Sequence, residues 1–318
     1  GKCFLADVTL NLSSTKHGIS AETIAADGAK INVVTAAKDG LHAECDYDNS
    51  KGDTSGTYTA ESGFVSLIGS EYTCNADGDG IQADTFLYIS GGECDIRTNG
   101  VFLSYSAANM SEYGVEADAY KKVASDYNGN ISARYALAQS CKGIKVGEIE
   151  YDTDGDDEDD YTVTDGMYAI VIESGDIKID STDDAIHCNG GDTFIRGGSI
   201  EIDTYDDGIT SDLLTSVKGG AVTVNSSYEG LEGAYVEISG GAVSVVSSDD
   251  GINAASDDTS IKEYILISGG EIVVDAEGDG LDSNGSILMT GGIVTVHGPT
   301  GGGDGALDSE TGIIVQGG

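Results

Sequence analysis

A short acidic turn recurs along the chain and constrains its fold more than any other feature. The turn reads Asp-Asp-Ala-Ile at 183–186 and Asp-Asp-Gly-Ile at 206–209 and 249–252. It returns with a single acid at 229–231, 278–281 and 303–305, so that successive turns lie 21 to 29 residues apart. An internal repeat of this length is typical of a stacked solenoid.

The segment between two turns has the pattern of short strands. Each regular repeat contains a glycine pair, and after it apolar residues alternate with polar or small ones, as in Ile200 and Ile202 or Val222 and Val224. Period-two alternation predicts a strand with one buried face. Three short strands fit the repeat length, whereas a propeller blade needs about 40 residues. Parallel stacking buries one continuous core, and parallel crossovers are almost always right-handed. We therefore expect one right-handed parallel β-helix over residues 1–318.

Three stretches interrupt the repeat. Residues 46–62 are polar and read as an exposed loop excursion, residues 104–140 as a lateral insertion, and residues 151–162 as a dense acidic loop. The last of these begins like a calcium loop with Asp152, Asp154 and Asp156, but Val163 stands where such a loop carries its glutamate. A solvated loop and a looser calcium site remain equal alternatives there.

The charge balance restricts the partners. The chain has 56 acidic and 15 basic residues, a net charge of −41. Such a surface disfavours nucleic acid and anionic membranes, and no apolar run approaches the roughly 18 residues of a membrane span. The chain shows no signal peptide, as expected of a mature or trimmed piece. We expect an extracellular or cell-surface location.

The acids of the turns stand in register. In a β-helix, equivalent residues stack about 4.8 Å apart, so a column of carboxylates repels itself unless a cation neutralises it. Carboxylate, amide and turn carbonyl oxygens are ligands that Ca²⁺ prefers. We expect a row of several Ca²⁺ ions, the alternative being solvated Asp-Gly turns. The residue just before the small turn residue and the residue four places after it are expected to converge. The candidate ligands are Asp79, Asp84, Asp183, Asp184, Asn189, Asp206, Asp207, Asp212, Glu229, Asp249, Asp250, Asp279, Asp282, Asn284 and Asp304.

The cysteines and the glycosylation motifs each leave two interpretations open. Cys74, Cys94 and Cys188 align with inward or small positions and read as core thiols, whereas a Cys3–Cys45 bridge is possible. Five Asn-x-Ser motifs permit glycosylation in a secreted protein, with coincidence the equal alternative. They begin at Asn11, Asn109, Asn130, Asn225 and Asn284.

Two segments resemble a known family. Lys142-Gly143-Ile144-Lys145 followed by the stretch from Asp183 to Asn189, together with the stretch from Ala37 to Glu44, is similar to the clostridial-type carbohydrate-binding β-helix proteins. The likeness covers most of 17–100 and 135–318. It implies a calcium-loaded, pectate-lyase-like β-helix that binds cellulose or polygalacturonate without established catalysis. Cys188, the additional cysteines and the 104–140 insertion depart from the family pattern.

Three functions follow as hypotheses. The first is a calcium-dependent polysaccharide-binding module without catalysis, with Ca²⁺ bridging to uronates or with Tyr205, Tyr228, Tyr235 and Lys145 contacting a glycan. The second is a structural subunit of a filament or cell coat that associates head to tail through the open solenoid ends. The third is a calcium-dependent polysaccharide lyase, whose base would be Lys142, Lys145 or Arg196. Lys142 is alternatively a substitute for a calcium ion through charge pairing.

Overall fold

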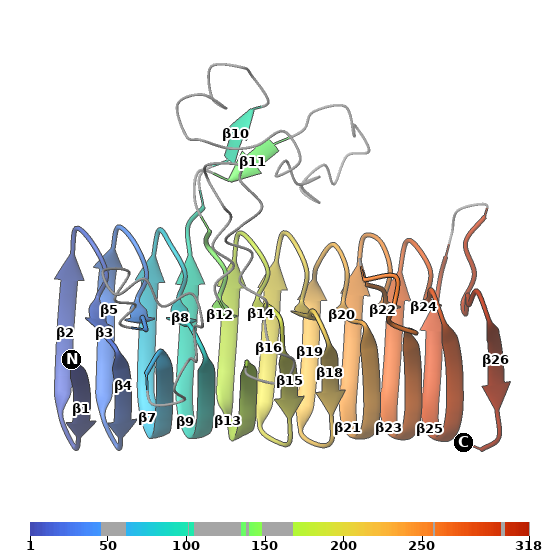
Figure 1. Cartoon of the computed structure of the whole chain (residues 1–318), viewed down its shortest axis with the longest axis horizontal. Helices are drawn as coiled ribbons and strands as arrows, with labels where there is room; N and C mark the ends of the chain where they lie inside the picture. The colour runs from blue at the N-terminus through green and yellow to red at the C-terminus, as the bar shows by residue number, and fades with distance from the viewer. Residues whose placement is uncertain are drawn as a thin grey trace.

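The chain is wound into a stack of rungs that runs from the N-terminus to the C-terminus (Figure 1). The computed structural model describes residues 1–45, 62–100, 102–104, 135–137, 140–147, 168–256, 258–299 and 303–317. These residues are all-β and contain no helix, so none of them forms a helix that could cross a membrane. Apart from one antiparallel pair, every strand pair among these residues is parallel, and the chain is a parallel β-helix, as the repeat predicts.

Each rung contributes to three strand columns. The first two columns belong to one sheet, because in six rungs a single long strand bends at its middle and serves both: β7 Phe64–Ala76, β9 Phe86–Thr98, β13 Ala169–Ser181, β21 Tyr235–Ser247, β23 Tyr264–Ala276 and β25 Ser286–His297. Elsewhere the first column holds β1 Lys2–Ala6, β4 Thr23–Asp27, β15 Asp192–Ile195, β18 Leu214–Val217 and β26 Gly312–Val315, and the second holds β2 Thr9–Ser14, β5 Lys30–Ala36, β16 Ser199–Thr204 and β19 Ala221–Ser226.

The third column is a sheet of three-residue strands that follow the acidic turns. These short strands are β3 Ile19–Ala21, β6 Leu41–Ala43, β8 Ile81–Ala83, β12 Ile144–Val146, β14 Ile186–Cys188, β17 Ile209–Ser211, β20 Leu231–Gly233, β22 Ile252–Ala254 and β24 Leu281–Ser283. Outside β3 their first and third side chains are buried, while the middle one is half-buried or, in β8, β17 and β22, buried. The middle residues therefore form a column of their own beside the acidic turns.

The glycine pairs make the bend between the first and second columns. At Gly220 the backbone has φ +84°, and an added Cβ would lie 2.6 Å from the carbonyl oxygen of Gly198 in the rung before. A side chain is excluded there both by the left-handed conformation and by the spacing of stacked rungs.

The core is the aliphatic stripe that the alternation predicts. Ile200, Ile202, Val222 and Val224 are at most 1% exposed and belong to one continuous cluster along the stack. Because every rung repeats the stripe, the core grows by addition and needs no second domain.

The six cysteines are free thiols. Cys74, Cys94 and Cys188 are buried in the core, which confirms the sequence prediction, and Cys141 is buried as well. The possible Cys3–Cys45 bridge is not formed: Cys3 packs on the core beside Ile24, whereas Cys45 lies after β6 and donates its N–H to Asp84.

The predicted interruptions lie mostly outside the described residues. This holds for 46–61, for 105–134 and for the whole acidic loop 151–162 with Asp152, Asp154 and Asp156. Within the predicted lateral insertion, β10 Phe102–Ser104 and β11 Tyr135–Leu137 form an antiparallel two-stranded sheet outside the stacked rungs (Figure 1).

Candidate functional site

The acidic turns stack with the register that the repeat predicts, except at the last turn. The turn N–H groups donate from rung to rung, for example Gly208 to Glu229, Gly230 to Asp250 and Gly251 to Asp279. The residues just before the small turn residue thus form one column, which we call the turn column: His17, Asp39, Asp79, Lys142, Asp184, Asp207, Glu229, Asp250, Asp279 and Gly305. The expectation for Asp304 is wrong, because the longer connection places Gly305 in the column and leaves Asp304 exposed one position earlier.

The column acids also stabilise the stack through their own hydrogen bonds. The Oδ1 atom of Asp207 accepts the backbone N–H of Glu229 at 3.0 Å, and Oδ1 of Asp250 accepts that of Asp279 at 2.6 Å. The same contact joins Asp39 to Asp79, Asp79 to Lys142, Asp184 to Asp207 and Asp279 to Gly305. One oxygen of each of these carboxylates is therefore used to bind the next turn, which the sequence alone does not reveal.

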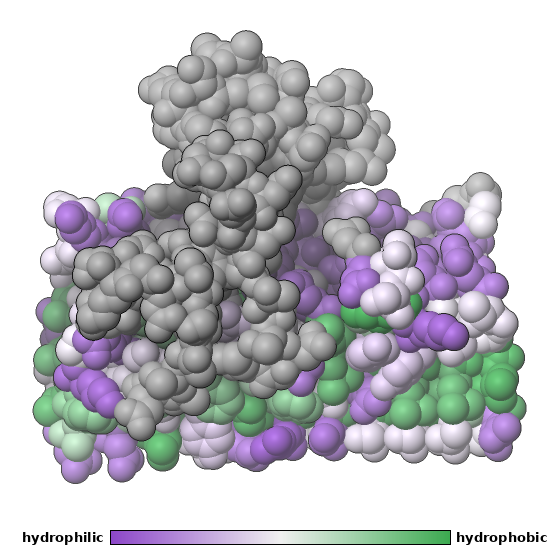
Figure 2. Space-filling model, in the orientation of Figure 1, coloured by the Kyte–Doolittle hydropathy of each residue, from purple (hydrophilic) through white to green (hydrophobic). Residues whose placement is uncertain are grey.

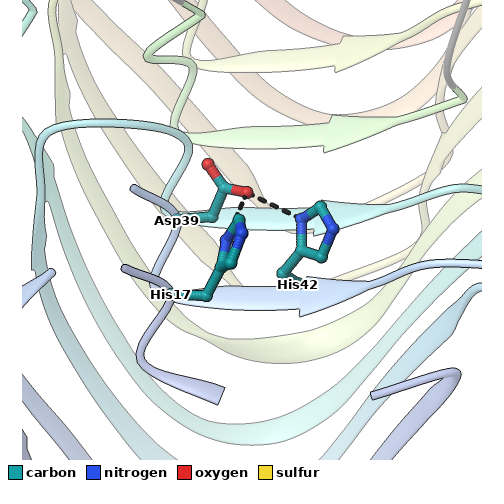
Figure 3. Close-up of side chains that lie close together, drawn as sticks. All are labelled: His17, Asp39 and His42. Carbon is teal, nitrogen blue, oxygen red and sulfur yellow. Dashed lines mark hydrogen bonds and ion pairs between the residues drawn. The ribbon is translucent and has the colours of Figure 1, made fainter. Parts of the chain in front are cut away.

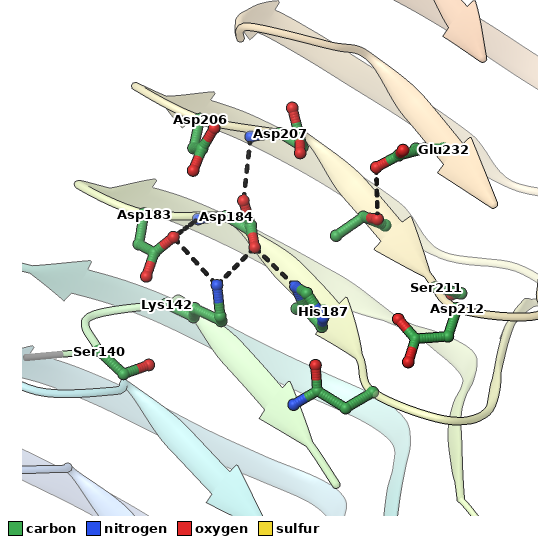
Figure 4. A network of polar contacts seen from close by, with 12 residues as sticks. Ser140, Lys142, Asp183, Asp184, His187, Asp206, Asp207, Ser211, Asp212 and Glu232 are labelled. Atoms are coloured by element: carbon green, nitrogen blue, oxygen red, sulfur yellow. Dashed lines mark hydrogen bonds and ion pairs between the residues drawn. The ribbon is translucent and has the colours of Figure 1, made fainter. Parts of the chain in front are cut away.

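Lys142 supplies a cation within the column. Its Nζ lies 3.0 Å from Asp183 Oδ1 and 2.5 Å from Asp184 Oδ2, and all three side chains are almost completely buried (Figure 4). His187 Nδ1 reaches the same Asp184 oxygen at 2.6 Å. The predicted charge pairing of Lys142 with turn acids is confirmed, and its role as a substitute for a metal ion stays a prediction. Two of the three acids grouped here, Asp183 and Asp184 of the set with Asp206, thus bind a cation of the protein itself.

Nearer the C-terminus the turns carry acids without such cations. Among the described residues, no Lys, Arg or His forms an ion pair with Asp207, Glu229, Glu232, Asp250, Asp279, Asp282 or Asp308. Burial, followed by the charge of Glu232, raises the pKa of Glu229 to about 8. Burial likewise raises the pKa of Asp250 to about 6 and that of Asp207 well above its ordinary value. These groups favour the neutral form unless a cation compensates them.

The middle residues of the short strands, rather than the residues two places further on, join the turn acids. Asp282 of β24 lies with Asp279 and Asp308 so that one oxygen of each falls within 4.8 Å of the others. Asn253 of β22 donates its amide to Glu229 Oε2 at 3.0 Å, while its buried Oδ1 has no hydrogen-bond partner. An oxygen-only donor set with an unsatisfied amide oxygen fits a hard cation such as Ca²⁺.

The residues four places after the small turn residue lie elsewhere. Asp84 accepts the N–H of Cys45, Asn189 donates to the carbonyl of Gly147, and Asp212 accepts the N–H of Gly190. These groups cap the opposite corner of the rung, because a three-residue strand of about 10 Å separates them from the turn. Asp84, Asn189 and Asp212 thus bind backbone groups of neighbouring rungs instead of the turn acids. The calcium-ligand role of these residues and of Asn284 stays a prediction. The sequence could have identified Glu232 and Asp308 from their place two residues after the small residue of the turn. Glu232 is the middle residue of β20, and Asp308 follows Leu307, which pairs with Leu281 of β24.

The predicted sugar contacts fall on two surfaces. Tyr205 is exposed and Tyr228 partly buried in the acidic turns, and Lys145 occupies the middle of β12. Tyr235 lies on the outer face of the first-strand column, where its ring stacks on Tyr264 of the next rung with centroids 4.8 Å apart. Tyr264 also donates its hydroxyl to Glu237 at 2.7 Å.

A hollow adjoins this stacked pair. It has a volume of about 620 Å³ and is lined by Lys262, Glu263, Tyr264, Leu266, Asn284, Gly285, Ser286, Leu288 and Thr311. Figure 2 shows an apolar band along the lower half of the molecule toward its C-terminal end, where the first-strand column of Figure 1 lies. The hollow therefore combines an aromatic ring, aliphatic side chains and polar groups at its rim.

The candidate glycosylation sites remain predictions. Asn11, Asn225 and Asn284 are exposed, whereas Asn109 and Asn130 lie outside the described residues.

Comparisons with known proteins place the chain in a family. A polysaccharide lyase-like protein from C. thermocellum, solved as a gadolinium derivative, aligns over 95% of this chain and 99% of its own at 14% identity, with a TM-score of 0.30, which supports no inference. No curated protein matches the sequence. The profile of the carbohydrate-binding domain-containing proteins matches residues 2–208 and, in a second match, residues 197–317. The chain belongs to the family of carbohydrate-binding domain-containing proteins.

Proposed function

We propose that the protein is an extracellular β-helix that binds polysaccharide in a calcium-dependent manner and does not cleave it. The observation that carries the proposal is the connection between two features at the C-terminal end of the stack. The acids Asp279, Asp282 and Asp308 gather at the start and middle of β24, and Asn284 and Gly285, which directly follow this strand, line the hollow beside Tyr264.

The outer face of the first-strand column supplies the glycan surface. Stacked tyrosine rings offer an apolar platform with polar edges, which suits the flat face of a pyranose. Tyr264 is held in place by Tyr235 and by its hydrogen bond to Glu237, so little ordering is required on binding. Asn284, Ser286 and Thr311 at the rim supply donors and acceptors for sugar hydroxyls.

The last turn links calcium to this surface. Ser309 and Thr311 both donate their hydroxyls to the carbonyl oxygen of Gly285, at 2.8 and 2.7 Å, and Thr311 lines the hollow. Asp308 belongs to the same turn. Ca²⁺ bound by Asp279, Asp282 and Asp308 would offset two of their three negative charges. With their repulsion reduced, the turn keeps Thr311 in position at the rim.

The contacts of two candidate bases support a protein that does not cleave the polysaccharide. Lys142 is paired with Asp183 and Asp184, and Arg196 lies 2.5 Å from Glu173 Oε1. A general base must be able to accept the substrate proton. The buried ammonium of Lys142 is held by two carboxylates, and the guanidinium of Arg196 stays protonated at neutral pH. Lys145 is the candidate base that these contacts do not address, and a polygalacturonate assay tests it: we expect no unsaturated product with the wild-type protein.

The proposal is tested by retention on insoluble cellulose and on polygalacturonate, with free Ca²⁺ at about a hundredfold excess over its dissociation constant, and with EDTA in parallel. We expect retention in Ca²⁺ and loss in EDTA. Tyr264→Ala should weaken binding, while Tyr205→Ala, at the acidic turns, is the matched control and should not.

The variants separate the two surfaces. If Tyr205→Ala loses binding and Tyr264→Ala does not, the polymer lies along the acidic turns and the proposed surface is wrong. Equal retention with Ca²⁺ and with EDTA would refute the calcium dependence alone, and no retention on either polymer would refute binding to both.

A further inference from the structure

Two histidines and an aspartate meet at the N-terminal end of the turn column. His17 stands in the first turn, Asp39 in the second, and His42 in the middle of β6. The Oδ2 atom of Asp39 lies 3.0 Å from His17 Nδ1 and 2.7 Å from His42 Nδ1 (Figure 3). The two rings are stacked with centroids 4.1 Å apart and planes inclined by 28°. Two ring nitrogens and one carboxylate oxygen therefore lie within 4.8 Å of one another.

The surrounding contacts hold this arrangement in place. Asp39 Oδ1 accepts the backbone N–H of Asp79 at 2.9 Å, which fixes the carboxylate and leaves Oδ2 to the imidazoles. The side chains of His17, Asp39 and His42 are only 19%, 11% and 13% exposed. His42 Nε2 lies 3.5 Å from Glu44 Oε2. Metal-bound histidines commonly turn their second ring nitrogen toward a carboxylate, which places the proton there and the lone pair on the metal side.

One atom of the cluster is unsatisfied. His17 Nδ1 is buried and makes no hydrogen bond, although it is close to Asp39 Oδ2. Buried polar atoms are nearly always satisfied, and an exception points to an ion or water at that place. His42 Nδ1 lies at hydrogen-bond distance, 2.7 Å, from the same oxygen, and the tautomer decides whether it donates. In the tautomer with the proton on Nε2, toward Glu44, the Nδ1 lone pair faces the carboxylate, and this repulsion is relieved when a cation lies between them.

We propose that His17, Asp39 and His42 bind a divalent transition metal ion of the zinc class. Imidazole nitrogen and carboxylate oxygen are zinc ligands, whereas Ca²⁺ takes oxygen ligands almost alone. Zn–N and Zn–O bonds of about 2.0–2.2 Å in a tetrahedron separate the ligand atoms by about 3.3 Å. The observed 2.7 and 3.0 Å require only small side-chain movements outward. A fourth position remains for water or an external ligand.

A second His–Asp pair in the same fold provides an internal comparison. His187 Nδ1 contacts Asp184 Oδ2 at 2.6 Å with the same three-residue spacing as His42 and Asp39. In that rung the neighbouring place in the turn column holds Lys142, whose ammonium occupies the position corresponding to His17 and pairs with Asp184. A fixed ammonium there excludes a metal cation, so His187 is the matched control.

The test is calorimetric titration of the full chain with Zn²⁺ alone in buffer containing excess Ca²⁺, which competes for the oxygen-only turns. We expect one Zn²⁺ site that Ca²⁺ does not displace. His17→Gln and His42→Gln should each abolish it, His187→Gln should leave it unchanged, and Glu44→Gln should weaken it by about 10- to 100-fold. Titration with Co²⁺ should give the visible absorption of a four-coordinate ion, lost in the His17→Gln and His42→Gln variants.

Thermal melts of the metal-free variants establish that each is folded. Unchanged Zn²⁺ affinity in both His17→Gln and His42→Gln would overturn the proposal, because the ion would then belong to the acidic turns. No Zn²⁺ binding by the wild-type protein, or equal loss in His187→Gln, would overturn it as well. The outcome is independent of the polysaccharide proposal, which does not involve these residues.

Discussion

Lys142 Nζ lies 2.5 Å from Asp184 Oδ2, at the place in the turn column where most rungs carry an acid. The side chain of Asp184 is 1% exposed. The contact indicates that buried carboxylates in the turn column need a cation beside them, because here the protein supplies one from its own side chains.

Removing that cation should destabilise the fold. Lys142→Met leaves Asp183 and Asp184 without their ammonium, and the loss of one partner from a buried ion pair typically costs about 3–5 kcal/mol. Denaturant unfolding in EDTA measures the change. Lys178→Met, which breaks the exposed pair with Glu201, is the control and should cost about 1 kcal/mol or less. Equal effects of the two substitutions would contradict the role assigned to burial.

Calcium removal should lower the melting temperature. An ion at hundredfold excess over its dissociation constant stabilises the folded state by about 2.7 kcal/mol per site. Asp282→Asn removes one ligand charge beside Asp279 and Asp308, so its calcium-dependent gain in stability should be smaller than that of the wild type. Asp95→Asn, an exposed acid on β9, is the control. A melting temperature that EDTA does not change would count against calcium in the turns.

The metal-free protein should lose stability as the pH rises toward 8. Glu229 has a folded-state pKa of about 8 against an ordinary value of 4.5, so folding favours its neutral form. That contribution is fully present below pH 4.5 and is lost as the pH rises through about 8. The slope is at most about 1.4 kcal/mol per pH unit for one proton. Glu229→Gln keeps the shape without the charge and should flatten the pH dependence in EDTA; an unchanged slope would show that Glu229 does not titrate in this window.

Adding a side chain should destabilise the protein more at Gly220 than at Gly69. Gly220→Ala places a Cβ 2.6 Å from the carbonyl oxygen of Gly198 at a φ of +84°. Gly69→Ala also has positive φ, +53°, but meets nothing within 4 Å. Conformational strain costs both about 1 kcal/mol, and the overlap should add about 1–3 kcal/mol for Gly220 alone. Urea unfolding of both variants separates the two terms, and equal losses would mean that rung spacing is not what excludes the side chain.

The thiols should differ in reactivity. Burial raises the pKa of Cys74 and of Cys94 to about 12, so neither forms a reactive thiolate near neutral pH. In the native protein a thiol reagent should modify the partly exposed Cys3 and Cys45 first, and all six should react after denaturation. A reducing agent should leave the melting temperature unchanged. A fall on reduction would indicate a disulfide in the protein.

The sequence by itself determined the architecture. Turns spaced 21 to 29 residues apart leave room for three short strands, and equivalent residues of stacked parallel rungs come to lie side by side. The inward places of Ile200, Val222 and Cys94 follow from period-two alternation, which is a local property of the chain. For the same reason the sequence identified most of the turn column and the cation at Lys142.

Only the tertiary structure decided which oxygens and nitrogens meet. Asp282, a candidate from the sequence, meets Asp279, and Asp308, which the sequence analysis did not single out, completes the group because the last turn folds back beside β24. The approach of His17 to His42, and of Asp250 to the amide of Asp279, joins residues more than 20 positions apart. Such contacts depend on rung spacing and side-chain direction, and no pattern along a single rung contains them.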